Sequence, residues 1–200
     1  MPDETRNDHG NSPDHCRASL VLVDVINDMQ FDGATSLLRH AIPMARRLKA
    51  LKRRAREAGI PVIYVNDNFG RWQSDWEKVV AYCLGEGMPG RPIVKMLKPD
   101  RRDYFILKPK HSGFYSTNLD VLLRHLGVET IILTGIAGNI CVFFTASDAH
   151  MRDFRVIVPS DCVASKTVKE NKHALEQMES IFEADVSPSA HLNLADLRDS

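Results

Sequence analysis

The sequence predicts a three-layer α/β/α domain, in which a mainly parallel sheet lies between two layers of helices. Short apolar runs rich in valine, isoleucine and leucine alternate along the chain with longer segments of helical periodicity. This alternation is typical of parallel strands joined by right-handed helical crossovers. Several runs are continuously apolar, as expected for strands that are covered on both faces. A length of 200 residues suits one such domain.

The first half of the chain contains two predicted strands and the helix that joins them. Residues 19–25 and 60–65 are apolar and β-branched, and Pro61 is compatible with a strand because it lies at its start. Residues 35–58 form the helix, and Gly59 suits the left-handed conformation in which helices often end. The basic stretch within this helix indicates a solvated amphipathic face; a polyanion site is the alternative.

The segment 66–103 interrupts the alternation. It contains one predicted helix, capped by Ser74 with Glu77 and continuing to Leu84, and then a stretch rich in glycine and proline. Long irregular connections in compact domains are often lids or binding loops. A surface excursion or a subunit contact is the alternative.

The alternation returns in the second half of the chain. Thr167 and Glu170 have the spacing of a capping box, which predicts a helix from residue 167 to 184. The other predicted elements are strands at 104–107, 130–134, 155–158 and, less regularly, 185–187, and helices at 119–126 and 140–151. Residues 1–18 lack apolar periodicity, so we expect a flexible N-terminal tail followed by one domain at 19–200.

Composition excludes several classes of function. There are 26 basic and 26 acidic residues, so the overall charge favours neither nucleic acid nor a membrane surface as a partner. No apolar run is long enough to span a bilayer, and the N-terminus shows no apolar leader. The 4 cysteines form no CxxC pair, which argues against zinc-ribbon and thioredoxin-like sites. We therefore expect a cytoplasmic protein with free thiols that acts on a small molecule.

Polar residues follow the predicted strands at the edge where parallel α/β sheets bind ligands. Asp24 comes after an apolar run, Asn66 follows the second strand, Lys108 ends the third and residues 135–141 follow the fourth. Because the carboxyl ends of parallel strands share one edge, we expect these groups to lie close together. Taken singly, Asp24 is also compatible with a turn residue, and Lys108 with a lysine whose stem packs on the surface.

Cys141 follows a strand and a turn of small residues at 135–138, and Asn139 is expected to cap a helix that begins at Ile140. In the first turn of a helix, free backbone N–H groups and the helix dipole stabilise a thiolate and lower its pKa from about 8.5. The same amides can hold the oxyanion that forms when a thiolate attacks a carbonyl. The alternative is a small buried thiol in the core.

The joint placement of these three side chains predicts nucleophilic catalysis. Cys141 is the expected nucleophile, and Asp24 is the expected base that takes the thiol proton and passes it to a leaving amine. Lys108 is expected to keep Asp24 ionised and to stabilise the negative charge that develops.

The same segments resemble the motifs of the isochorismatase-like cysteine hydrolases, a superfamily that includes nicotinamidase and N-carbamoylsarcosine amidase. Leu22-Val23-Asp24 followed by Asn27-Asp28 is similar to the opening motif, and the segment from Lys108 to Phe114 to the lysine motif. The segment from Gly135 to Val142, continued by Thr145, Asp148 and Ala149, is similar to the nucleophile motif. The resemblance covers most of the predicted domain.

This resemblance implies a six-stranded, mainly parallel sheet of the Rossmann-like, isochorismatase-like hydrolase fold and a triad of Asp24, Lys108 and Cys141. It also implies a cis peptide bond between Ile136 and Ala137, which aims the amides of Ala137 and Cys141 at the oxyanion. Members are commonly homo-oligomers, so we expect a dimer or tetramer.

The sequence departs from two members of the superfamily. Nicotinamidases carry an Asp-x-His metal motif after the second strand, whereas residues 66–70 contain no histidine here, so we expect no metal and no other cofactor. True isochorismatases lack the cysteine and cleave a vinyl ether by acid catalysis, so Cys141 argues against that activity.

The predicted function is hydrolysis of a C–N bond in a small amide or ureido substrate through a thioester on Cys141. Vinyl ether hydrolysis and a non-catalytic, partner-binding role are the alternatives. The aromatic pocket candidates are equally compatible with core or interface positions. The candidates for the substrate pocket are Asn27, Asn66, Phe69, Trp72, His111 and Phe114.

Overall fold

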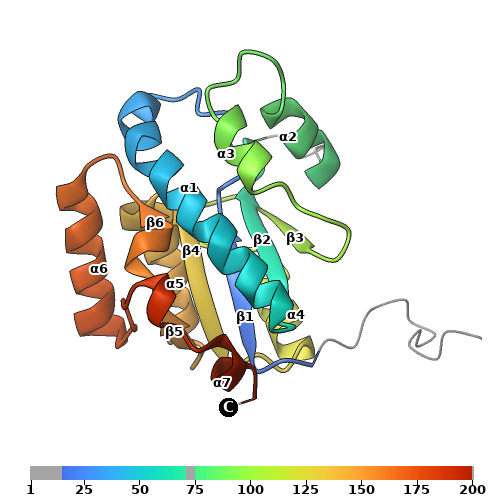
Figure 1. Ribbon diagram of the computed structural model, residues 1–200, viewed down its shortest axis with the longest axis vertical. Coiled ribbons are helices and arrows are strands. Elements are labelled where there is room, and N and C mark those ends of the chain that lie inside the picture. Colours follow the sequence, from blue (N-terminus) through green and yellow to red (C-terminus); the bar gives the residue numbers. More distant parts are fainter. Residues whose placement is uncertain (1–14, 71–74, 200) are drawn as a thin grey trace, which may run out of the picture.

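The computed structural model of this chain describes residues 15–70 and 75–199. In this part of the chain, six parallel strands form one sheet between two layers of helices (Figure 1), which confirms the predicted fold class. The described residues contain no helix that is long and apolar enough to cross a membrane.

The strand order places the two central strands beside the point where the chain changes direction. The order is β3-β2-β1-β4-β5, with the short β6 pairing with β4 beyond the end of β5. The chain runs outward from β1 to β3 and then returns to the other side of β1, and such switch points are where open α/β sheets bind ligands. The strands are β1 (Ala18–Val23), β2 (Val62–Asp67), β3 (Tyr104–Lys108), β4 (Thr130–Ile136), β5 (Arg155–Ile157) and β6 (Val163–Ala164).

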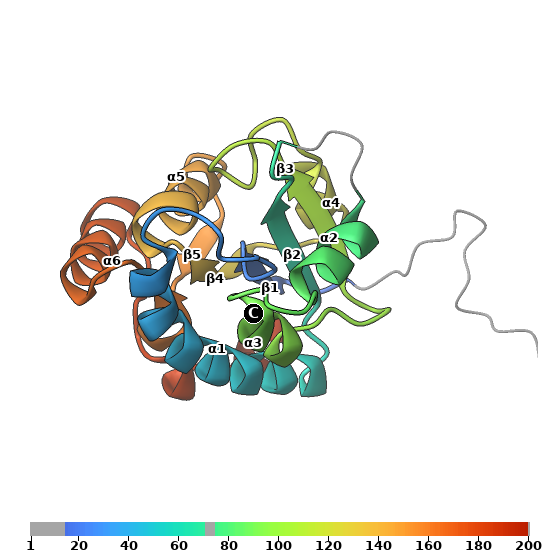
Figure 2. The same ribbon diagram turned by 90° about the horizontal axis from the view of Figure 1, so that it is seen from above.

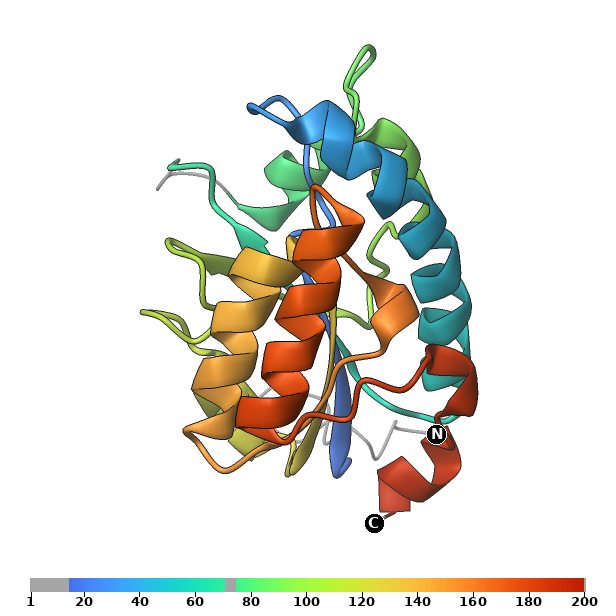
Figure 3. The ribbon, with the colours of Figure 1, turned by 90° about the vertical axis from the view of Figure 1, so that its left-hand side faces the viewer.

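The helices divide between the two faces of the sheet, and each face has its own apolar core. Seen from above, α1 and α3 cover one face, and α4 and α5 the other (Figure 2). Figure 3 shows α6 beside α5, with α1 on the opposite side of the sheet. The helices are α1 (Ala34–Glu57), α2 (Trp76–Cys83), α3 (Arg91–Met96), α4 (Leu119–His125), α5 (Phe143–His150), α6 (Val168–Phe182) and α7 (Leu194–Asp199).

The sixth strand is not the one that the sequence predicted. The segment at 185–187 contributes only an isolated bridge between Asp185 and Ile157. The sixth strand is β6, whose two residues pair with Gly135 and Ile136 at the end of β4. A strand of two residues has too short a pattern to be recognised from hydrophobic periodicity.

The observed helices differ from the prediction in three places. The helix after residue 74 is capped by Asp75, whose carboxylate accepts the N–H of Lys78, whereas Ser74 lies outside the described residues. The glycine- and proline-rich stretch contains the short helix α3, and a Cβ on the preceding Gly90 would lie 1.8 Å from the carbonyl oxygen of Asn27. Only glycine therefore permits this contact with the loop after β1. The terminal α7 was not predicted either.

Cys16, which was expected in the N-terminal tail, belongs to the core. Its side chain is 5% exposed, and its N–H donates to the carbonyl oxygen of Leu126 at 2.9 Å. β1 begins at Ala18, one residue earlier than predicted. A single apolar residue between polar neighbours shows no periodicity, which explains the difference. The remainder of the expected tail, residues 1–14, lies outside the described residues.

Candidate active site

Three loops at the carboxyl edge of the sheet bring Asp24, Lys108 and Cys141 together. Asp24 follows β1, Lys108 is the last residue of β3, and Cys141 lies in the turn after β4. The Nζ atom of Lys108 lies 2.9 Å from Oδ2 of Asp24 and donates to Sγ of Cys141 at 3.5 Å. The three residues singled out from the sequence therefore form one contact cluster.

The backbone around Asp24 directs its carboxylate into this cluster. Asp24 adopts a left-handed conformation with φ 53°, and its N–H donates to the carbonyl oxygen of Val65 at 3.0 Å. Its Oδ1 accepts the N–H of Asp67 at 2.7 Å, which leaves Oδ2 for Lys108. Burial raises the pKa of the Asp24 carboxyl, while Lys108 and the hydrogen bonds to the carboxylate oppose the rise.

Lys108 is fully buried, and its ammonium group has a partner for each of its three N–H bonds. These partners are Asp24, Cys141 and the carbonyl oxygen of Lys110, which accepts at 3.1 Å. The carboxylate of Asp67 lies farther away, at 3.8 Å. Burial alone would lower the pKa of Lys108, but the carboxylate of Asp24 and the Cys141 sulfur raise it, so the lysine is held as a cation.

The turn that carries Cys141 differs from the helix start that was predicted. Residues Gly138–Val142 form a single π-helical turn, and α5 begins only at Phe143. Asn139 is not the helix cap; it lies inside the turn, and its N–H donates to Oγ of Ser165 at 3.2 Å. The peptide bond between Ile136 and Ala137 is cis, at the position where the family resemblance places such a bond.

The protonation state of Cys141 also differs from the expectation of a stabilised thiolate. Burial and the neighbouring carboxylate of Asp24 raise the pKa of the Cys141 thiol to about 12, although Lys108 opposes the rise. The thiol also hydrogen-bonds to Asp24. At neutral pH Cys141 is therefore a thiol beside the carboxylate of Asp24. It loses its proton only when another group stabilises the thiolate.

Among the pocket candidates within the described residues, His111 is the one in contact with Cys141. Its Nδ1 lies 3.9 Å from Sγ, and its ring stacks on Phe144 with a centroid distance of 5.7 Å. Both side chains are exposed, so they form an aromatic wall at the mouth of the site.

The structure places the other pocket candidates elsewhere. Asn66 is fully buried, and its amide is bonded to both the N–H and the carbonyl oxygen of Ile26, so it fixes the loop after β1. Phe114 is buried in the core and stacks on Phe154. Asn27 is half-buried and closes a turn by accepting the N–H of Met29. The two remaining candidates are Phe69, which packs against the core of the α1 face, and Trp72, which lies outside the described residues.

Two neighbours of the cluster were not assigned a role from the sequence. The hydroxyl of Thr145 donates to the carbonyl oxygen of Cys141 at 2.6 Å and accepts the N–H of Gly113 at 3.0 Å. It therefore ties the nucleophile turn to the loop after Lys108. Ser112 in the same loop donates to the carboxylate of Asp148. The spacing of Thr145 and Asp148 along α5 could have indicated that they face the site, but their partners in the loop after Lys108, Gly113 and Ser112, lie 32 and 36 residues away in sequence.

Within residues 15–70 and 75–199, no three His, Cys, Asp or Glu side chains are grouped so that they could hold a metal ion. Asp67, in the segment at 66–70 that contains no histidine, accepts the N–H of Phe69 at 2.6 Å.

Comparison with known proteins agrees with the fold. Residues 18–190 match the model of the Isochorismatase domain family. The uncharacterized isochorismatase family protein YaaI of Bacillus subtilis is 41% identical over 169 residues, which cover 84% of this chain and 92% of YaaI. Ureidoacrylate amidohydrolase RutB of Methylobacterium radiotolerans is 32% identical over 190 residues, which cover 82% of this chain and 73% of RutB. The crystal structure of N-carbamoylsarcosine amidase from Thermoplasma acidophilum superposes with a TM-score of 0.70 at 29% identity, covering 88% of this chain and 99% of the amidase.

Proposed function

The chain belongs to the isochorismatase family of hydrolases, and we propose that it is a cysteine amidohydrolase that cleaves a C–N bond in a small amide or ureido compound. The observation that carries this proposal is the contact of one buried ammonium group with both a carboxylate and a thiol, Lys108 with Asp24 and Cys141. This is the set of groups that an acyl transfer to sulfur needs: a nucleophile, a base and a fixed positive charge.

In the proposed first step, the thiol of Cys141 gives its proton to Asp24 as Sγ attacks the substrate carbonyl. The carbonyl oxygen becomes an oxyanion, which the backbone N–H groups of Ala137 and Cys141 would stabilise. Asp24 then returns the proton to the leaving nitrogen, the C–N bond breaks, and an amine or ammonia leaves. The acyl group stays on Cys141 as a thioester.

In the second step, Asp24 takes a proton from water, and the resulting hydroxide attacks the thioester. The C–S bond breaks, the sulfur recovers the proton from Asp24, and the acid is released. Lys108 stays protonated throughout, because it contacts both groups whose charge changes. The raised pKa of the Asp24 carboxyl suits this cycle, because a raised pKa makes its carboxylate a better acceptor for the proton of the Cys141 thiol.

The substrate class is inferred from two relatives. RutB is named a ureidoacrylate amidohydrolase, and the amidase acts, by its name, on N-carbamoylsarcosine. Both names describe a carbamoyl group on nitrogen, and cysteine attack on such a group would release ammonia. The chain also resembles a Bacillus subtilis isochorismatase at 29% identity, but the thiol at the centre of the cluster favours a thioester over acid cleavage of an ether.

The test is ammonia release from a panel of small amides and ureido acids, including ureidoacrylate and N-carbamoylsarcosine. We expect turnover of at least one ureido compound, and a loss of about a thousandfold or more in Cys141→Ser. The matched control is Cys83→Ala, which alters a buried thiol of the opposite core face. A substrate adduct on Cys141 should be trapped by acid quench and seen by mass spectrometry. Unchanged turnover in Cys141→Ser, or cleavage of isochorismate alone, would overturn the proposal.

A further inference from the structure

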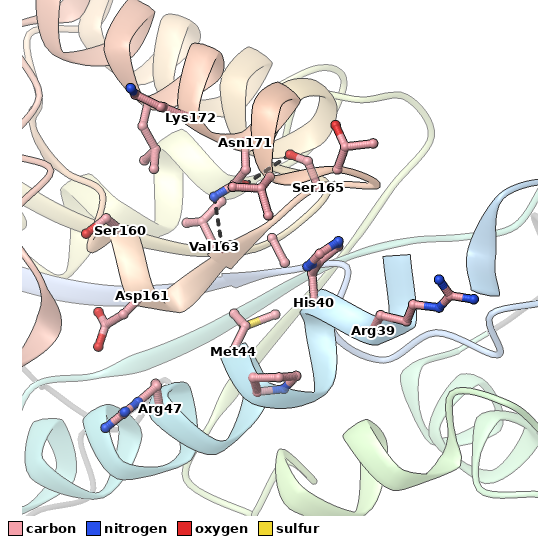
Figure 4. A pocket seen from close by; sticks show the side chains of 15 residues that line it. Arg39, His40, Met44, Arg47, Ser160, Asp161, Val163, Ser165, Asn171 and Lys172 are labelled. Atoms are coloured by element: carbon pink, nitrogen blue, oxygen red, sulfur yellow. Dashed lines mark hydrogen bonds between the residues drawn. The ribbon is translucent and has the colours of Figure 1, made fainter. Parts of the chain in front are cut away.

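A cavity of about 540 Å³ lies between α1 and α6 (Figure 4), and its lining includes none of Asp24, Lys108 and Cys141. Its volume is in the range of pockets that hold small molecules. Side chains of α1 form one wall, the chain around β6 forms the floor, and the first turns of α6 form the other wall. Representative lining residues are Arg39, Met44, Arg47, Val163, Ser165 and Asn171.

The two ends of this α1–α6 cavity differ in charge. Figure 4 shows Arg39 at one end and Arg47 at the other, with Asp161 on the side of Arg47. Lys172 also lines the cavity, but it is paired with Glu176 at 3.6 Å. No carboxylate lines the cavity near Arg39, and within the described residues Arg39 makes no hydrogen bond or ion pair. The Arg39 end is therefore the electropositive one.

The same cavity offers an apolar surface and a free hydrogen-bond donor. Met44 extends from α1 toward β6, and Val163, Ala164 and Leu175 line the space around it. The amide of Asn171 donates to the carbonyl oxygen of Val163 at 3.3 Å, and within the described residues its second N–H has no acceptor. A ligand with an apolar body and an anionic end fits this combination.

The floor of the cavity is also the support of the nucleophile turn. Oγ of Ser165 accepts the N–H of Asn139 and donates to Oδ1 of Asn171 at 3.0 Å. Gly138 lies directly behind these side chains, since a Cβ on it would approach Oδ1 of Asn171 to 2.6 Å. A ligand that moves Ser165 or Asn171 therefore also acts on the turn Gly138–Val142, which contains Cys141.

We propose that the α1–α6 cavity is a second binding site, which takes a small organic anion with its charged end toward Arg39 and its apolar body against Met44 and β6. Binding there changes the reactivity of Cys141 through Ser165 and Asn171. The charged end is recognised by the guanidinium of Arg39, and the apolar body supplies the remaining contact area.

The first experiment measures binding of 3-phenylpropionate to the full chain by calorimetry, with 3-phenylpropan-1-ol as the uncharged probe. We expect saturable binding of the carboxylate and about tenfold weaker binding in Arg39→Gln, the loss of one charge-assisted contact. The matched control is Arg53→Gln on the same helix. Arg53 is exposed, as Arg39 is, but it pairs with Glu57. Its affinity should equal that of the unmodified chain.

The binding site is separated from the active site by alkylating Cys141 with iodoacetamide before the titration. We expect the alkylated chain to bind 3-phenylpropionate with the same affinity. Loss of binding after alkylation would place the probe at Cys141 and overturn the proposal. Equal binding of the alcohol, or no saturable binding of the carboxylate, would overturn it as well.

The second experiment tests the coupling without reference to any hydrolytic activity. The rate at which iodoacetamide modifies Cys141 is followed by mass spectrometry with and without 3-phenylpropionate. We expect a change of about threefold or more in the unmodified chain, and no change in Arg39→Gln at the same probe concentration. An equal rate with and without bound probe would show that the site is not coupled to the nucleophile. Because neither readout requires turnover, this inference and the proposed amidohydrolase activity can fail independently.

Discussion

Nζ of Lys108 lies 2.9 Å from Oδ2 of Asp24, and the two side chains are 0% and 8% exposed. Two opposite charges removed from water in this way are held by each other and by their hydrogen bonds. Asp24 has the N–H of Asp67 as a further donor, and Lys108 has the carbonyl oxygen of Lys110 as a further acceptor. Removal of either charge therefore leaves the other charge buried and without its main partner.

Replacement of Lys108 by methionine should therefore destabilise the chain in a pH-dependent way. Removal of one member of a buried ion pair typically costs about 3–5 kcal/mol, because the remaining charge is uncompensated. Without the lysine, the pKa of Asp24 should rise further, since Lys108 lowers it. The free energy of unfolding should thus fall most at pH 8, where the carboxylate is charged, and least at pH 5, where it takes up a proton.

Urea unfolding at the two pH values measures this effect, with the exposed Lys110→Met as the control. The control should change the free energy of unfolding by less than about 0.5 kcal/mol at either pH. An equal loss for Lys108→Met at both pH values would show that the uncompensated charge is not its cause.

Replacement of Asp24 by asparagine should lower the pKa of the Cys141 thiol while it abolishes hydrolysis. After burial, the carboxylate of Asp24 is the main influence that raises this pKa to about 12. Its removal leaves Lys108 as the dominant neighbour, which favours the thiolate. The measurement is a titration of thiolate absorbance in the ultraviolet, taken as the difference from Cys141→Ser.

The control for this titration is Asp67→Asn, because Asp67 lies 3.8 Å from Lys108 but is not among the groups that shift the Cys141 pKa most. We expect the control to titrate like the unmodified chain. A Cys141 pKa that stays near 12 in Asp24→Asn would mean that burial alone sets it, and that the base does not contact the thiol.

The sequence was informative about the site where a polar residue ended an apolar run. Asp24 and Lys108 could be placed at one sheet edge because parallel strands with known direction bring their ends together. Cys141 could be placed beside them for the same reason. The π-helical turn and the raised thiol pKa could not be predicted, because they depend on contacts of Asn139 with Ser165 and of Cys141 with Asp24, both distant in sequence.

The pocket candidates show the same limit. Asn66 was a reasonable choice from its place near the end of a strand, but its side-chain amide is bonded to the backbone of Ile26 in another loop, 40 residues away in sequence. Phe114 was a candidate from the segment that resembles the lysine motif, and its burial against Phe154 is a property of the packed core. β6 and α3 were missed because two and six residues give too little periodicity to recognise.

Replacement of Thr145 by valine should slow turnover more than its effect on stability explains. Valine keeps the shape of the side chain but removes the hydroxyl that joins Cys141 to Gly113. The buried N–H of Gly113 loses its acceptor, which costs about 1–3 kcal/mol. Because the hydroxyl also fixes the carbonyl of Cys141, we expect kcat to fall about tenfold with little change in KM.

The matched control is Thr134→Val, which removes a buried hydroxyl that donates to the carbonyl oxygen of Val21 at 2.9 Å. It should destabilise the chain to a similar extent, as measured by thermal unfolding, and leave kcat within about twofold. A parallel fall of kcat in both variants would assign the loss to stability and not to the position of Cys141.

Replacement of Gly138 by alanine should displace the nucleophile turn, and a second substitution should partly restore it. A Cβ at this position would lie 2.6 Å from Oδ1 of Asn171 and 2.7 Å from Cγ1 of Val163. Overpacking of this kind costs about 1–3 kcal/mol, and a shift of the reactive sulfur by 1 Å can lower kcat by about a hundredfold. Val163→Ala removes one of the clashing atoms, so Gly138→Ala combined with Val163→Ala should recover part of kcat, although Val163→Ala alone should not raise it. Steady-state kinetics of the four chains measure this coupling, and full activity in Gly138→Ala, or equal losses with and without Val163→Ala, would show that the turn is not held in place by the packing behind it.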